Sequence, residues 1–303
     1  MKAGPFKPHS EVIIGCMIYG TLGIFLDRIR EMSAGSILFY RLLFGFFVLL
    51  LYLSLSGGPG QLRPGKNRKY LILLAVLNTL TGLAYFTSIQ LSGMSIAVLL
   101  LYTAPVYVNF LAPLVLGEKS GKNPLPLFLV LAGVLLVARP EKLIGDLGLA
   151  PGTNPVSIPG LAAGLLSGLS FSGVILTVRY LKDDYTGLAK TFWVTGLGLI
   201  LTLPFAFITP LSVLFENLGI LLLLALTATF AILLHLKGFS GLRARTGSIL
   251  ALLEPVFGIF FDHTVLKSPL YTGTVLGCIF ILAAAVLVSL ESPFRGRSFS
   301  EKE

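Results

Sequence analysis

The chain carries very little charge. Only 12% of its 303 residues are Asp, Glu, Lys or Arg, while 55% are hydrophobic and the mean hydropathy is +0.89. Soluble domains contain about 25% charged residues, so this composition excludes a water-soluble globular protein. Disordered chains are poor in hydrophobic residues, and the 33 glycines lie within apolar runs. Disorder and a collagen-like structure are therefore excluded as well.

Cysteine and histidine are also scarce. The two cysteines, Cys16 and Cys278, fall in apolar segments and predict packing roles rather than a disulfide or a metal site. The three histidines form no His-Glu-x-x-His zinc motif. We therefore expect neither a bound metal nor a cofactor.

The net charge of +9 is not accompanied by a basic stripe interleaved with aromatic residues, the pattern that single-stranded nucleic acid requires. Clustered Lys and Arg in so apolar a chain instead indicate the anionic cytoplasmic leaflet of a lipid bilayer. We expect lipid, and no nucleic acid, as a partner.

Long apolar runs are abundant. About 20 apolar residues cross a bilayer as a helix, and the runs lack the alternation of barrel strands, so the sequence predicts an all-α integral membrane protein with ten transmembrane helices. The first run resembles a signal peptide but has no cleavage site, and we interpret it as a retained span. The expected spans are 11–26, 34–56, 70–90, 95–116, 125–138, 158–181, 188–208, 218–236, 246–266 and 270–290.

Lys and Arg are unevenly distributed between these spans. With the N-terminus inside, the inner segments, counted together with Arg179 and Lys190 at the inner ends of their spans, hold 17 of them and the outer segments 5, and Arg41 lies within a span. Short cytoplasmic loops are enriched in Lys and Arg. Both termini, including the tail 291–303, are therefore expected on the cytoplasmic side of a cell membrane, plasma or inner.

The two halves of the chain are similar. A shift of 150 residues aligns Pro105-Val106 with Pro255-Val256, Phe110 with Phe260, and Val115-Leu116 with Val265-Leu266. The expected repeats, 11–140 and 155–290, contain five spans each. Because five is odd, the second repeat must enter the membrane upside down, which is the plan of secondary transporters with a substrate site at the repeat interface.

Several short motifs occur in a characteristic order. Phe39-Tyr40-Arg41-Leu42 lies on the second span, Tyr102-Thr103-Ala104-Pro105-Val106 on the fourth, followed by Gly117-Glu118, and Leu253-Glu254-Pro255-Val256 on the ninth. With these motifs the chain resembles the drug/metabolite transporter superfamily, in particular its ten-helix family with two EamA domains. The resemblance implies a transporter that exports amino acids, metabolites or drugs, without fixing the substrate.

The chain departs from that family pattern in two places. Tyr19-Gly20 stands where the family often has Trp-Gly, and Ser268 stands at the position that matches Glu118 of the first half.

Pro105 and Pro255 lie in mid-span at matching positions. Each lacks the N–H that would bond the carbonyl four residues earlier, so each is expected to kink its helix. The freed carbonyls either line a polar cavity between broken helices or are satisfied by a neighbouring Ser, Thr or water. We expect a pocket enclosed by the third, fourth, eighth and ninth spans, with contributions from the first and sixth.

Glu254 is the acidic residue nearest the middle of a span. An ionisable group at that depth is a functional candidate: Glu254 can take part in proton coupling, or hold a substrate ammonium as a carboxylate. The structural alternatives are an ion pair with Arg41 or hydrogen bonds to free backbone carbonyls. Arg41 in turn either pairs with an acidic residue or contacts a substrate anion.

Other polar residues are weaker candidates. His235 either marks the membrane interface or belongs to a proton path, and Asp262 with His263 is interpreted as interfacial. The side chains expected to line a pocket for an organic solute are Tyr85, Thr87, Ser88, Tyr102, Thr103, Tyr107 and Asn109. Each has interhelical hydrogen bonding as its alternative role.

Gly160, Gly164 and Gly168 lie four residues apart on the sixth span and predict close helix packing, either within one chain or in a dimer. An intramembrane enzyme with Ser170 as nucleophile and His235 as base, or a passive facilitator, is the alternative to transport. Neither an enzyme nor a simple receptor explains an inverted duplication. The sequence thus predicts a non-enzymatic secondary transporter of small organic solutes that works by alternating access and uses a proton gradient as its candidate driving force.

Overall fold

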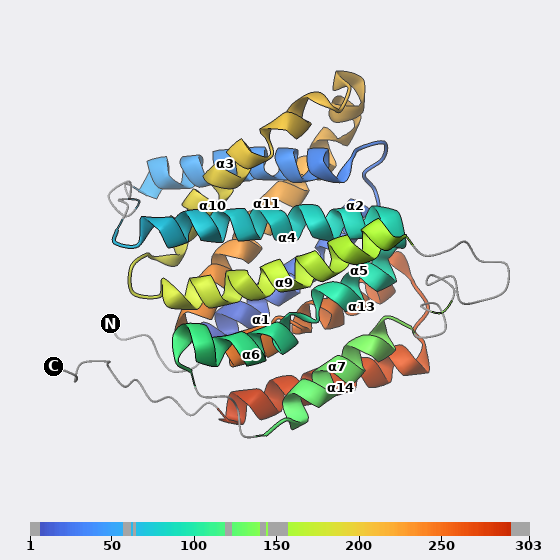
Figure 1. Cartoon of the computed structure of the whole chain (residues 1–303). Helices are drawn as coiled ribbons and strands as arrows, with labels where there is room; N and C mark the ends of the chain where they lie inside the picture. Colours follow the sequence, from blue (N-terminus) through green and yellow to red (C-terminus); the bar gives the residue numbers. More distant parts are fainter. Residues whose placement is uncertain are drawn as a thin grey trace.

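The computed structural model describes residues 7–56, 62, 65–118, 123–139, 144 and 157–291, and these residues form helices without any strand. Figure 1 shows the helices running side by side in one bundle. They are α1 (Lys7–Gly20), α2 (Leu22–Leu26), α3 (Ala34–Ser56), α4 (Arg68–Ser92), α5 (Met94–Leu101), α6 (Ala104–Leu116), α7 (Leu125–Val137), α9 (Ile158–Tyr180), α10 (Gly187–Leu201), α11 (Leu211–Gly241), α12 (Ala244–Leu250), α13 (Leu253–Leu266) and α14 (Thr272–Glu291), with a 3-10 helix at Leu203–Phe207.

The predicted all-helical membrane fold is confirmed. Eight stretches are long and apolar enough to cross a membrane, counting α1 with α2, α5 with α6 and α12 with α13 as one stretch each. The shorter apolar helices α7 and α10 supply the two other predicted spans. Of the expected tail, all but Glu291 lies outside the described residues.

The seventh and eighth spans differ from their predicted lengths. Helix α10 ends at Leu201 rather than Ile208, because Pro204 cannot continue the hydrogen-bond ladder of an α-helix. Helix α11 begins seven residues earlier than predicted, at Leu211. In this added segment the side chain of Asn217 exchanges hydrogen bonds with the backbone N–H and carbonyl of Arg30.

Three of the spans are interrupted. The breaks lie at Thr21, at Tyr102 and Thr103, and at Ala251 and Leu252. The latter two replace the predicted kinks, since Pro105 and Pro255 lie in the first turns of α6 and α13 rather than inside a continuous helix. Proline fits there because the first N–H groups of a helix have no intrahelical partner.

The halves correspond closely in structure. Under the 150-residue shift the ends of α5 and α12 agree within one residue, and so do the starts of α6 and α13. Gly117 and Lys267, which end α6 and α13, also coincide, and both adopt left-handed backbone angles with φ of 63° and 57°.

Packing between the halves is reciprocal. The third helix of each half packs on the first helix of the other, α4 on α9 and α11 on α1, and the fifth helices α7 and α14 pack on one another. At the last contact the backbones approach closely, because a Cβ added at Gly133 would lie 2.8 Å from the Gly277 carbonyl oxygen.

Figure 1 shows that α1 and α9, the first helices of the two halves, begin at opposite ends of the bundle. The halves therefore run in opposite directions, as an odd number of spans per repeat requires. We call the two ends of the bundle the α1 end and the α9 end after the helix that begins there.

Candidate functional site

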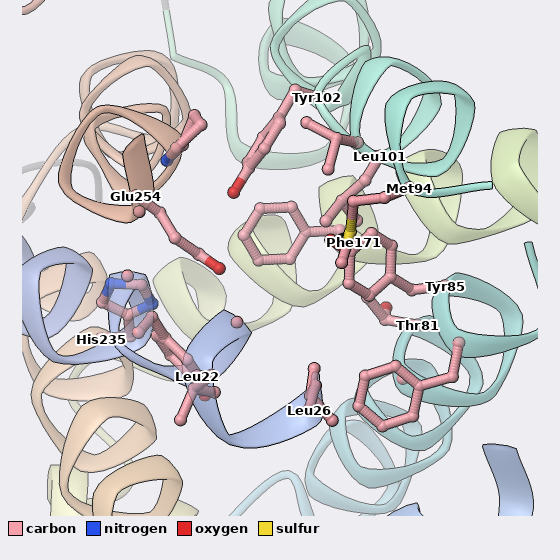
Figure 2. Close-up of a pocket in the computed structure, with 18 of the residues that line it drawn as sticks. Leu22, Leu26, Thr81, Tyr85, Met94, Leu101, Tyr102, Phe171, His235 and Glu254 are labelled. Carbon is pink, nitrogen blue, oxygen red and sulfur yellow. Dashed lines mark hydrogen bonds between the residues drawn. The ribbon is translucent and has the colours of Figure 1, made fainter. Parts of the chain in front are cut away.

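A cavity of about 370 Å³ lies between the two halves of the bundle (Figure 2). Its lining comes from the six predicted spans, that is from α1 with α2, α4, α5, α9, α11 and α13. Arg41 of α3 and the end of α7 also contribute. Of the predicted site residues, the cavity brings together Glu254, Arg41, Tyr85, Tyr102, His235 and Pro255.

The breaks in the fourth and ninth spans place two polar side chains in the cavity. Glu254 is the second residue of α13, directly after one break, and Tyr102 lies within the other. Figure 2 shows the Glu254 carboxylate pointing into the cavity and the Tyr102 hydroxyl facing it. The matching breaks of the two repeats thus place a carboxylate and a phenol opposite one another.

Arg41 and Glu254 line the same cavity without forming an ion pair. Among the residues that the structure describes, no carboxylate lies within 4.0 Å of the Arg41 guanidinium and no Lys or Arg nitrogen lies within 4.0 Å of the Glu254 carboxylate. The ion pair between Arg41 and Glu254, which the sequence analysis gave as an alternative structural role, is therefore not formed.

Cys16 holds the break between α12 and α13. Its thiol lies 3.4 Å from the carbonyl oxygen of Leu250 and 3.6 Å from that of Ala251. The Nε2 atom of His235 lies 3.4 Å from the same sulfur. Cys16 is fully buried, so a residue interpreted from the sequence as mere packing also contacts backbone carbonyls at the break.

The His235 ring faces other aromatic rings as well. Its centroid lies 4.9 Å from that of Tyr19 and 5.0 Å from that of Phe239. His235 is thus a buried member of the cavity wall, not a residue at the membrane interface. Ser170, its partner in the enzyme alternative, accepts a hydrogen bond from Thr81 instead, and no hydrogen bond joins Ser170 to His235 in the described chain.

Several candidates from the fourth span lie away from the cavity. Tyr107 and Asn109 are half-buried but are not part of the lining, and Pro105 is buried in the packed interior. The Thr103 hydroxyl donates to the Leu100 carbonyl oxygen at 2.6 Å. The sequence predicted a kink at Pro105, whereas the span is interrupted at Tyr102 and Thr103 and α6 begins at Ala104.

The three glycines of the sixth span contact helices of the same chain. A Cβ added at Gly160 would lie 2.9 Å from the Leu91 Cβ of α4, and one at Gly168 would lie 2.4 Å from the Leu100 carbonyl oxygen of α5. Gly164 approaches Leu100 in the same way. These small residues allow α9 to approach α4 and α5, which carry Tyr85 and Tyr102 toward the cavity.

A polar network joins four helices at the α1 end. The Glu118 carboxylate accepts a hydrogen bond from the Arg179 guanidinium at 2.9 Å and another from the backbone N–H of Ala244 at 2.9 Å. Arg179 also donates to the Ser240 carbonyl oxygen at 2.8 Å. Glu118 therefore links the end of α6 with the ends of α9 and α11 and the start of α12.

Further polar contacts strengthen the same end. Lys237 of α11 pairs with Glu11 of α1 at 2.9 Å, and Arg245 of α12 pairs with Glu291 of α14 at 3.2 Å. Lys190, which we counted with the inner Lys and Arg residues, is fully buried in α10 and donates to the Ser240 hydroxyl at 2.7 Å. Contacts between distant segments thus join the helices at the α1 end.

The α9 end is built differently. The cavity lining reaches Leu26, Met94, Ala138 and Asp262, which lie at or near the ends of α2, α5, α7 and α13. There Arg139, which follows α7, lies over the ring of Tyr271, which precedes α14, with 3.6 Å between the guanidinium carbon and the ring centroid. The carbonyl oxygen of Ser268, the counterpart of Glu118, lies 2.8 Å from His263 Nδ1, and the backbone N–H of Ser268 donates to the Asp262 carbonyl oxygen at 3.2 Å.

Ten apolar spans in two oppositely directed halves, with a cavity between the halves, define the class of this molecule as a multi-pass helical membrane transporter. The model of the EamA-like transporter family matches residues 10–139 and 158–290. The chain therefore belongs to the EamA-like transporter family, and the resemblance drawn from its motifs is confirmed.

Similar proteins agree with this assignment. An uncharacterized transporter of Archaeoglobus fulgidus is 27% identical over 284 residues, which cover 92% of this chain and 95% of that protein. The uncharacterized inner membrane transporter YicL of Salmonella typhimurium is 25% identical, with 96% and 98% of the two chains covered. A solved crystal structure, 17% identical, has the same fold with a TM-score of 0.71 over 93% of this chain and 97% of that one.

Proposed function

We propose that this membrane transporter is a secondary active exporter of small organic solutes that works by alternating access and couples export to proton entry through Glu254. The observation that carries the proposal is a cavity between oppositely directed halves, with a carboxylate inside and with ion pairs that join the helices at one end of the bundle. Inverted repeats around a central site are the arrangement through which secondary transporters expose that site alternately.

The distribution of Lys and Arg supports an orientation. The segments predicted to be inner, which hold 17 of these residues, connect helices at the α1 end (Figure 1). Placing that end in the cytoplasm follows the positive-inside rule and puts both chain ends in the cytoplasm of a cell with this protein in its plasma or inner membrane. The described state then faces outward, as an exporter does when it releases its solute.

The proposal of proton coupling rests on the lack of a Lys or Arg nitrogen within 4.0 Å of the Glu254 carboxylate in the described chain. A buried carboxylate without a cationic partner is costly, and binding a proton removes that cost. A positively charged group of the solute removes the same cost. If both compete for one carboxylate, proton entry releases the solute outside and proton loss permits solute binding inside.

The alternatives to active transport have less support. A channel or passive facilitator needs a path that is continuous in one state, whereas ion pairs join the helices across the α1 end. An intramembrane hydrolase needs a nucleophile beside its base, but Ser170 and His235 have other partners.

Counterflow in proteoliposomes tests the proposal. Vesicles containing the purified protein are loaded with one unlabelled solute from a panel of amines, amino acids and organic acids, and entry of the labelled solute is followed. We expect at least one solute to exchange and to be recovered chemically unchanged. Chemical conversion of a solute would indicate an enzyme, and the absence of exchange across the panel would contradict transport of small organic solutes.

A further inference from the structure

We infer that the cavity binds a monovalent organic amine with an aromatic body and without a carboxylate beside its nitrogen. This inference rests on the proposed function only for the claim that the ligand is transported; binding itself is tested separately.

The charge of the cavity favours a cation. The ionisable lining residues are Glu254, Asp262, Arg41 and the buried His235, so with a neutral imidazole two carboxylates oppose one guanidinium. Glu254 has no Lys or Arg nitrogen within 4.0 Å in the described chain. A ligand ammonium would supply the missing partner, and buried charges of opposite sign are stable only when paired.

Aromatic rings surround the carboxylate. Tyr19, Tyr85, Tyr102, Phe171 and Phe239 all line the cavity, and Figure 2 shows the Phe171 ring between the Glu254 carboxylate and Tyr85. An ammonium is attracted to the faces of such rings, and the same rings pack against a flat apolar body. Pockets of about 300 Å³ and more suit small organic ligands, and this cavity of about 370 Å³ falls within that range.

The position of Arg41 disfavours an α-amino acid. Arg41 of α3 and Glu254 of α13 line the same cavity and form no ion pair with one another in the described chain. An α-amino acid carries its ammonium and carboxylate on one carbon, so a molecule bound to Glu254 would hold its own carboxylate beside Glu254, where like charges repel.

Three indole compounds separate these possibilities. Tryptamine carries only the ammonium, tryptophan adds a carboxylate on the same carbon, and indole-3-propionate carries only a carboxylate. Binding of each labelled compound to the purified full-length protein in lipid nanodiscs is measured for the wild type, Glu254→Gln and Glu216→Gln. Glu216 is exposed on α11 outside the cavity lining and provides the matched control.

We expect tryptamine to bind the wild type and Glu216→Gln alike, and tryptophan and indole-3-propionate to bind at least about tenfold more weakly, the loss that 1.4 kcal/mol represents. Glu254→Gln, checked for folding by its thermal unfolding, should lose tryptamine affinity by a similar factor. Equal or tighter binding of tryptophan, unchanged tryptamine binding in Glu254→Gln, or no tryptamine binding to the folded wild type would each overturn the inference.

The binding measurement tests the ligand class, and the counterflow measurement tests the proposed transport function. Tryptamine that binds as expected but does not exchange in counterflow would contradict transport while leaving the ligand class intact. Exchange of another solute by a protein that does not bind tryptamine would contradict the ligand class alone.

Discussion

At the scale of single residues, Glu254 is the central group of the cavity. It follows directly on a helix break, faces Tyr102 across the cavity, and has no basic partner within 4.0 Å in the described chain. The sequence alone could nominate it, because an acidic residue in the middle of an apolar span is expensive to insert and needs a reason.

Other residues of the site could not be nominated from the sequence. Cys16, Arg179 and Lys190 matter through partners that lie 234, 61 and 50 positions away. Composition and periodicity describe neighbours along the chain, so such contacts leave no local signal. Tyr107 and Asn109 are the reverse case, since their polarity suggested a pocket and they are not among the residues that line this cavity.

Substitution of Glu254 should impair transport and leave folding intact. We expect Glu254→Gln to lower gradient-driven transport by about tenfold or more, since hydrogen bonds to charged groups contribute about 1.5–3 kcal/mol, while thermal unfolding stays near that of the wild type. Asp262→Asn should have a smaller effect, because Asp262 lies toward the α9 end. Wild-type transport rates in a well-folded Glu254→Gln protein would reduce Glu254 to a structural group.

The glycines of α9 allow a prediction about stability. A Cβ at Gly168 would lie 2.4 Å from the Leu100 carbonyl oxygen, whereas a Cβ at Gly219 of α11 would have no atom within 4 Å. We therefore expect Gly168→Ala to destabilise the protein by roughly 1–3 kcal/mol through overpacking. Gly219→Ala should leave stability unchanged or slightly higher. Thermal unfolding in detergent compares the two, and equal midpoints would show that α9 has room to move away from α5.

At the scale of elements, the interrupted helices determine how the site is built. The sequence predicted irregularity at Pro105 and Pro255 because proline cannot continue a helix. It did not predict that each helix ends before its proline and restarts, nor the break at Thr21, whose counterpart Phe171 lies inside the continuous helix α9. The two repeats therefore differ where they line the cavity, and sequence similarity alone does not reveal that difference.

We expect the contacts of Glu118 to control how readily the α1 end opens. Glu118→Gln should weaken its contacts with Arg179 and Ala244 and favour the state open at that end. A cysteine introduced at Phe239, the cavity residue nearest the end of α11, reports on this opening through labelling by an impermeant maleimide. We expect its labelling from the cytoplasmic side to rise roughly fivefold or more, the factor that 1 kcal/mol represents.

A second ion pair at the same end is the control for Glu118. Asp183→Asn removes the exposed pair between Lys182 and Asp183, and exposed pairs contribute little, so labelling at position 239 should not change. Equal labelling in the Glu118→Gln and wild-type backgrounds would mean that the network does not hold this end closed.

At the scale of the whole molecule, the duplication was the most informative feature of the sequence. The shift of 150 residues predicted two five-span halves running in opposite directions, and the helices are arranged in this way (Figure 1). The reciprocal packing of α4 on α9 and of α11 on α1 could not be predicted, because apolar spans carry little information about which neighbour each will choose.

The orientation in the membrane is open to a direct test. Because Lys and Arg gather in the segments at the α1 end, reporter fusions after residue 303 and within residues 57–69 should both give cytoplasmic signals. Fusions within residues 140–156 should give the opposite signal. A cytoplasmic signal from all three positions would contradict the ten-span arrangement.

The central claim is that this protein moves an organic solute against its gradient at the expense of a proton gradient. The most direct measurement is accumulation of a labelled solute in proteoliposomes when a pH difference is imposed, with a protonophore added midway. The account predicts accumulation above the external concentration that collapses when the protonophore is added. Solute that only equilibrates across the membrane, at a rate indifferent to the pH difference and to the protonophore, would contradict it and indicate a passive facilitator.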